Sequence, residues 1–235
     1  MAERLAARPN LAVILSLAGR TAKPAPQPVP VRIGGFGGVP GLLEELARER
    51  IDVVIDATHP YAATISVHAL EATRSSAIPL LILRRPPWEA ISGDRWTEVA
   101  EISAAVRSLG VGPRRVFLAL GRKELAPFLE APQHHYLIRS VDPVDPPLAV
   151  PDANYVTGRG PFSEADDCAL LEKHAIEVVV AKNSGGPATY GKIAAARMLG
   201  LDVIMLRRPE RPKSTADVVE TVGDAVKWLD HTLAH

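Results

Sequence analysis

The sequence of 235 residues has one cysteine, no net charge and no long apolar run. Because Cys168 stands alone, an internal disulfide and a zinc site made of cysteines are excluded, which fits a reducing compartment. The 27 basic residues balance 27 acidic ones, so no overall field attracts nucleic acid or an anionic membrane. No apolar segment approaches the roughly 20 residues that cross a bilayer, and residues 1–10 lack the apolar centre of a signal peptide. We therefore expect a cytoplasmic protein with local binding sites.

Two kinds of site are also missing from the sequence. His134 and His135 are adjacent, so they cannot easily bind one metal ion together, and no third ligand stands at a recognisable spacing. We therefore predict no metal site. The sequence lacks the G-x-x-x-x-G-K-S/T motif as well, which places a nucleotide-dependent transferase last among the functions considered.

What the sequence does contain is a regular alternation of short apolar runs and helical segments. This alternation predicts an α/β protein with parallel sheets, and 47% hydrophobic residues suffice for the cores. We place a domain boundary near Glu98, which gives an N-terminal domain of residues 1–98 and a C-terminal domain of residues 99–235. The proline-rich segment 141–152 is the competing boundary, and we interpret it as a loop inside the second domain.

Residues 177–199 are typical of a strand, a turn and a helix. A β-branched run up to Ala181 suits a buried strand, and the following glycines allow left-handed backbone and close approach by a ligand. The pattern predicts a helix over 188–199, ended by Gly200 and starting directly after the turn. A helix N-terminus beside hydroxyl and ammonium groups favours an anion, although a plain connection with a solvated lysine stays open. The donors are Lys182, Ser184, Thr189 and Lys192.

Polar turn residues follow the apolar runs along the whole chain. Ligands of open α/β sheets bind outside the carboxyl ends of the strands, so we expect these turns to line one cleft. Asp56 and His59, in the segment DATHPYA, suggest acid-base chemistry and are the candidate catalytic residues. Asp56 could equally cap the next helix or pin the turn. A histidine that precedes a proline is biased to extended backbone and is more often structural.

Eight segments, taken in order, resemble the precorrin-6A reductase family. They are SLAGR from Ser16, RIGGFGG from Arg32, DATHPYA from Asp56, RPPW from Arg85, GDRW from Gly93, ALGR from Ala119, RGPF from Arg159 and AKNSGG from Ala181. The resemblance implies two Rossmann-like domains with a ligand cleft between them. It also implies NADPH-dependent reduction of one double bond of precorrin-6A, a macrocycle with many carboxylates, to give precorrin-6B in cobalamin biosynthesis.

The resemblance implies a division of the candidate residues between two ligands. Arg20 stands where a dinucleotide fold meets the adenosine ribose, and a basic side chain there suits the 2′-phosphate of NADPH rather than NADH. The implied cofactor-binding residues are Ser16, Gly19, Arg20, Gly34, Gly35, Gly37 and Thr58. The implied substrate-binding residues are Tyr61, Arg122, Lys123, Arg139, Arg159, Gly160, Phe162, Lys182, Ser184, Gly185, Gly186, Thr189 and Lys192. The implied partners are a small precorrin and, transiently, neighbouring enzymes of the pathway.

One departure from the family pattern lies at the start of the sequence. The family begins with a further strand and a glycine-rich turn, and neither precedes Ala2 here. A Rossmann sheet places that strand centrally, so we expect its two neighbours to lack a pairing partner. The alternative function is therefore a non-catalytic binding protein for an anionic tetrapyrrole or a nucleotide.

Overall fold

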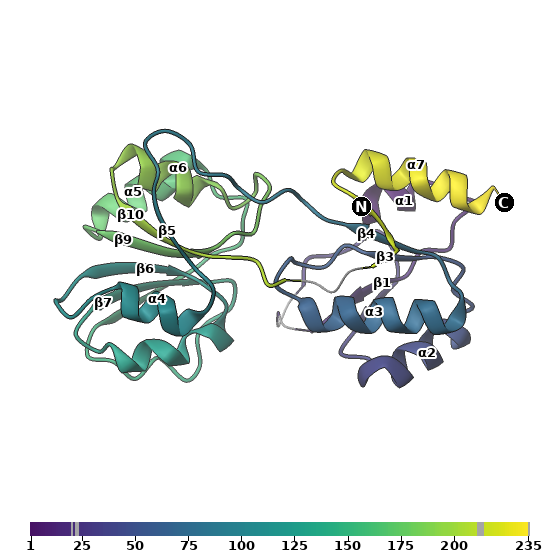
Figure 1. The fold of residues 1–235 in the computed structure, drawn as a ribbon, viewed down its shortest axis with the longest axis horizontal. Coiled ribbons are helices and arrows are strands. Elements are labelled where there is room, and N and C mark those ends of the chain that lie inside the picture. Colours follow the sequence, from purple (N-terminus) through teal and green to yellow (C-terminus); the bar gives the residue numbers. More distant parts are fainter. Residues whose placement is uncertain (20, 22–23, 211–213, 235) are drawn as a thin grey trace. The chain divides into compact units, whose positions relative to one another are not determined.

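A computed structural model of the protein describes residues 1–19, 21, 24–210 and 214–234. The chain forms two compact units. Unit 1 comprises Met1–Arg85 with Glu210–His235, and unit 2 comprises Pro86–Pro209 (Figure 1). All strand pairs are parallel within the described residues, so the predicted α/β class with parallel sheets is confirmed.

Unit 2 contains one six-stranded sheet in the order β5-β10-β9-β6-β7-β8. Val178, Val179 and Val180 in the inner strand β9 are 0% exposed, as expected for a β-branched run with strands on both sides and helices on both faces. The strands are β5 (Arg95–Val99), β6 (Arg115–Ala119), β7 (His135–Ser140), β8 (Ala153–Thr157), β9 (Val178–Lys182) and β10 (Asp202–Leu206).

Helices cover both faces of this sheet: α5 and α6 lie on one face and α4 on the other (Figure 1). Ser163 caps α5, because its hydroxyl accepts a hydrogen bond from the Asp166 N–H at 3.0 Å. The α-helices are α4 (Ile102–Ser108), α5 (Glu164–Lys173) and α6 (Gly191–Met198), and two short 3-10 helices are η1 (Arg122–Glu124) and η2 (Ala126–Glu130).

Unit 1 contains two shorter sheets. The first pairs β1 (Leu15–Leu17) with β2 (Val31–Ile33), and the second has the order β11-β4-β3. In the described chain β1 pairs only with β2 and β3 only with β4, so each of β1 and β3 has one edge without a paired strand. The remaining strands are β3 (Val54–Asp56), β4 (Leu80–Leu83) and β11 (Asp217–Val219).

The helices of unit 1 also form two layers. Leu42 and Leu46 of α2 pack against Ala69 and Ala72 of α3 on one side of the strands, and α7 lies on the other side (Figure 1). No helix in the described parts of the chain is long and apolar enough to cross a membrane. The helices are α1 (Ala2–Ala6), α2 (Gly38–Arg48), α3 (Ala63–Ser76) and α7 (Val222–Leu233).

The compact units differ from the domain boundary that we predict near Glu98. Glu98 lies inside β5, where it pairs with Met205 of β10, so this segment belongs to unit 2. The C-terminal segment returns to unit 1 because β11 pairs with β4, with Val218 beside Ile82. The sequence predicts one helix over 215–231, whereas the chain forms β11 first and then α7. The 141–152 segment is a loop inside unit 2, as expected.

Candidate functional site

In unit 1, two glycine turns meet at the carboxyl ends of β1 and β2. The Gly34 N–H donates to the Leu17 carbonyl at 2.9 Å, and a Cβ added to Gly19 would lie 3.2 Å from Ile33. Arg32 braces the second turn, since its guanidinium donates to the Gly34 carbonyl at 2.8 Å and to the Gly35 carbonyl at 3.0 Å. Gly19 and Gly34 are thus neighbours. Arg20 lies outside the described residues.

The turn after β2 leads into the N-terminus of α2. The sequence predicts a helix over 42–50, whereas α2 starts at Gly38. Gly34 and Gly37 have φ of 122° and 78°, which only glycine adopts without strain. Among the described residues, nothing lies within 4 Å of a Cβ added at Gly34, Gly35 or Gly37, so the described part of the chain leaves this face of the turn open. The first turn of α2 carries no acidic residue. An open glycine turn at a helix N-terminus suits an anion such as a pyrophosphate.

Asp56 and Thr58 form a hydrogen-bonded cluster at the carboxyl end of β3. The buried Asp56 carboxylate accepts from the Thr58 N–H at 3.0 Å and from the Thr58 hydroxyl at 2.6 Å, and that hydroxyl lies 3.2 Å from the hydroxyl of Ser66. Ala62 rather than Asp56 is the N-cap of α3. These contacts favour the interpretation that Asp56 pins the turn. His59 is exposed, and its ring lies 5.6 Å from that of Tyr61.

A cavity of about 210 Å³ lies beside this cluster, between α3 and the strands β4 and β11. Its lining is mainly apolar, with Ser66, Arg84 and Ser214 as polar members. Ser66 connects the cavity to the Asp56 cluster through the hydroxyl of Thr58. Ser66 and Arg84 are absent from the sequence-based site, although Arg84 follows an apolar strand as the predicted basic residues do.

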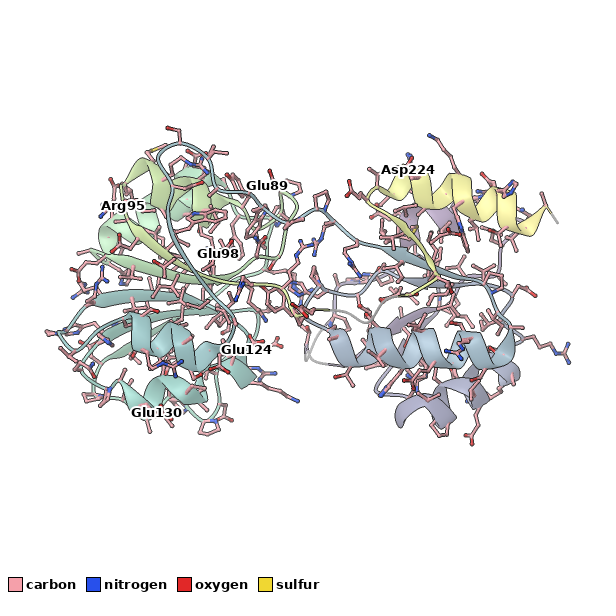
Figure 2. The ribbon with its side chains drawn as sticks, viewed as in Figure 1. Glu89, Arg95, Glu98, Glu124, Glu130 and Asp224 are labelled. Atoms are coloured by element: carbon pink, nitrogen blue, oxygen red, sulfur yellow. The ribbon has the colours of Figure 1, made fainter. Side chains whose placement is uncertain are left out.

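In unit 2, two predicted substrate residues already have carboxylate partners. The Lys182 ammonium lies 2.6 Å and 2.7 Å from the two carboxylate oxygens of Glu124, the last residue of η1, which follows β6 (Figure 2). The Gly121 N–H also donates to this carboxylate at 2.6 Å. Arg139 forms a buried ion pair with Asp167. Neither Glu124 nor Asp167 carries a sequence signal that identifies its partner.

Arg139 and Phe162 belong to the packing under the carboxyl edge of the sheet. The guanidinium carbon of Arg139 lies 3.8 Å from the centre of the Phe162 ring and 4.9 Å from that of Phe117. The Phe162 N–H donates to the Ala188 carbonyl at 3.1 Å, and a Cβ added to Gly160 would lie 3.1 Å from the same oxygen. The turn after β8 is therefore fixed to the turn that precedes α6.

The sequence predicts that a helix over 188–199 starts directly after the glycine turn that follows β9. This prediction is wrong, because α6 begins at Gly191 and a turn over 187–190 comes first. Lys192 is 4% exposed, and its ammonium donates to the Thr189 carbonyl at 2.5 Å. Burial, together with the nearby charge of Arg139, lowers the pKa of Lys192 to about 7. Lys192, in the first turn of α6, thus bonds to Thr189 of the turn that precedes the helix.

Gly185 corrects a second expectation. The sequence suggests that a glycine there admits a ligand, but a Cβ at Gly185 would lie 2.1 Å from the Pro86 carbonyl oxygen. The space beside Gly185 is therefore occupied by the protein's own backbone. The exposed basic residues of this edge include Arg122 and Lys123 after β6, Arg159 after β8 and Arg207 after β10. Because β10, β9, β6, β7 and β8 are successive parallel strands of one sheet, these side chains share one edge with Lys182 and Ser184.

The sequence profile described as "Precorrin-6x reductase CbiJ/CobK" matches residues 1–230. The chain belongs to this family. The resemblance that the eight motifs indicate is thereby confirmed. A protein of Sinorhizobium sp named "Precorrin-6A reductase" is 52% identical over 234 residues, which cover 100% of this chain and 89% of the relative. One of the same name from Rhodobacter capsulatus is 49% identical, over 93% of this chain and 86% of the relative.

A solved structure titled "CobK precorrin-6A reductase" has a similar fold. Its TM-score is 0.89 at 48% sequence identity, and the match covers 93% of this chain and 86% of that one. At this identity, the likeness extends to the family as well as to the fold.

Proposed function

We propose that this protein uses NADPH to reduce one double bond of precorrin-6A, giving precorrin-6B in cobalamin biosynthesis. The observation that carries the proposal is the 52% identity, over the whole chain, to a relative named "Precorrin-6A reductase". A binding function alone would be the alternative, and nothing in the two units favours it over reduction.

The open turn of unit 1 supports the cofactor half of the proposal. Backbone N–H groups at Gly35 and Gly37, with the N-terminus of α2, would hold the pyrophosphate. The ribose would lie towards Ser16, and Arg20 would pair with the 2′-phosphate. Bound NADPH supplies a hydride, so the protein must chiefly orient two ligands and exclude water. The buried Asp56 would act by keeping the Thr58 turn in place.

The carboxyl edge of unit 2 supports the substrate half. Exposed Arg122, Lys123 and Arg159 would pair with carboxylates of the macrocycle, as guanidinium and ammonium groups do. Lys182 would join them if a substrate carboxylate replaced that of Glu124, which lies 2.6 Å away. Arg139, Phe162 and Lys192 are buried or packed beneath, and we assign them a supporting role. Ser184 and Tyr61 remain candidates for polar and ring contacts.

The test is a spectroscopic assay with enzymatically made precorrin-6A. We expect the absorbance of the nicotinamide band to fall only when protein, NADPH and precorrin-6A are all present, and to fall more slowly with NADH. Binding of precorrin-6A without oxidation of NADPH would support the alternative, a binding protein. A matched pair of variants sharpens the assay: Arg159→Ala should weaken substrate binding by about 1.5 to 3 kcal/mol, whereas Arg95→Ala, at the opposite end of the sheet, should not.

A further inference from the structure

The two segments that connect unit 2 to unit 1 meet at the glycine turn after β9. The chain enters unit 2 at Pro86 and leaves it at Pro209. From the leaving segment, the Arg208 guanidinium donates to the Asn183 carbonyl at 2.9 Å and to the Pro86 carbonyl at 3.0 Å. One side chain therefore joins the leaving segment to the turn and to the entering segment.

Asn183 forms a second set of hydrogen bonds between the turn and the connecting segments. Its buried side-chain amide accepts from the Trp88 N–H at 2.7 Å and donates to the Trp88 carbonyl at 2.8 Å. Its backbone N–H donates to the Leu206 carbonyl at 3.1 Å. The indole N–H of Trp88 in turn donates to the Gly186 carbonyl at 2.9 Å. The turn is thus held to both connecting segments by several separate hydrogen bonds.

Gly185 lets these parts come together. Its φ is 66°, and it is buried. A Cβ at this position would lie 2.1 Å from the Pro86 carbonyl oxygen and 2.4 Å from an Arg208 guanidinium nitrogen. Any side chain would therefore push the entering segment and the guanidinium away from the turn.

We propose that Asn183 and Arg208 are positioning residues, which fasten the turn 184–186 to both connecting segments so that a substrate held at the turn restrains those segments. The inference rests on the proposed function, since it assumes a substrate at this edge. Breaking the hydrogen bonds of a buried side-chain amide leaves polar groups unsatisfied. These hydrogen bonds therefore resist movement of the turn and the two connecting segments relative to one another. A lysine at 208 keeps the charge but cannot reproduce the planar fork that reaches two carbonyls.

The first experiment needs no ligand: hydrogen exchange of the full chain, followed by mass spectrometry. In Arg208→Lys we expect amides in both 88–90 and 207–210 to exchange about tenfold faster, with β6 and β7 unchanged. The neighbouring exposed Arg207→Lys is the matched control and should leave both segments unchanged. Faster exchange confined to 207–210 would overturn the proposal. If Arg208→Lys does not fold, Asn183→Asp serves instead, because it replaces the amide that donates to the Trp88 carbonyl with a carboxyl group. Its hydrogen exchange is compared in the same two segments.

The second experiment adds precorrin-6A and NADPH. In the parent protein we expect the substrate to slow exchange in the turn and in both connecting segments, and in Arg208→Lys in the turn alone. Turnover should fall about fivefold or more, with KM within about twofold. A raised KM at unchanged kcat would identify Arg208 as a direct substrate ligand and overturn the positioning role. A parent protein that oxidises no NADPH would contradict the proposed function. The ligand-free hydrogen exchange of Arg208→Lys would still show whether Arg208 links the two connecting segments.

Discussion

Both units contain parallel strands, but unit 2 has one six-stranded sheet, whereas unit 1 has two shorter sheets. In unit 2, β9 has strands on both sides and helices over both faces, and its three valines are 0% exposed. In unit 1, neither β1 nor β2 contains a fully buried residue, and Ile33 is 58% exposed. An apolar sequence run is therefore not enough to make a core strand, because neighbours on both edges are also needed. We expect the stability of the protein to be concentrated in unit 2.

The carboxyl edges of the two units also differ. Unit 1 presents glycine backbone with open space beside Gly34 and Gly35, whereas unit 2 presents charged side chains that are largely paired, such as Lys182 with Glu124. The first arrangement suits an anion bound by N–H groups, and the second suits a ligand whose carboxylates compete with those of the protein. The difference matches the division that we propose between cofactor and substrate.

The largest effect should come from breaking the core of unit 2. Arg139→Ala leaves the carboxylate of Asp167 buried without its partner, which should lower the free energy of unfolding by about 3 to 5 kcal/mol. Denaturant unfolding measures the loss. The matched control is Arg159→Ala, an exposed arginine of the same edge, with an expected change within about 0.5 kcal/mol. Replacing both partners, Arg139→Met with Asp167→Asn, should recover part of the loss; equal losses in the single and double variants would refute the buried pair as its cause.

Hydrogen exchange compares the two units directly. We expect the amides of Val179 and Val180 to exchange at least about a hundredfold more slowly than those of Ser16 and Leu17, since edge strands open locally while a central strand opens only with its sheet. Native-state exchange resolved by NMR gives both rates in one sample. Similar protection in β1 and β9 would show that unit 1 is as cooperative as unit 2, despite its two separate sheets.

Substitutions at two glycines of unit 1 distinguish an effect on stability from an effect on NADPH binding. A Cβ at Gly41 would lie 1.8 Å from the Phe36 carbonyl oxygen, so Gly41→Ala should destabilise unit 1 by about 1 to 3 kcal/mol. Gly35→Ala meets open space and should leave the melting temperature unchanged while weakening NADPH binding, because the new methyl group stands where the cofactor would approach. Calorimetry and NADPH titration distinguish the two effects. A Gly35→Ala variant with full NADPH affinity would place the cofactor elsewhere.

How much of this could be predicted depends on the range of the interactions involved. Apolar runs and turn residues are local, so β9, α3 and the Ser163 cap follow from the sequence. The strands β5 and β11 do not. β5 is mostly polar and Val99 is its only buried residue, and β11 has only three residues, none of them buried, so pairing with β10 and β4 holds them. The partners of Lys182 and Arg139 are also set by the fold, across 58 and 28 positions.

The smallest effect that we predict is a pH dependence that belongs to unit 2 alone. The pKa of Lys192 is lowered to about 7 by burial, against an ordinary value of 10.5. Between these values the unfolded chain binds more protons than the folded one, so the contribution of Lys192 makes the protein more stable as pH rises from about 7, by at most about 1.4 kcal/mol per pH unit. Urea unfolding between pH 7 and 9 should show this slope, and Lys192→Met should remove it. Lys227 of α7 in unit 1 has an exposed side chain, so Lys227→Met should keep the slope. A slope that survives in Lys192→Met would assign the titration to another group.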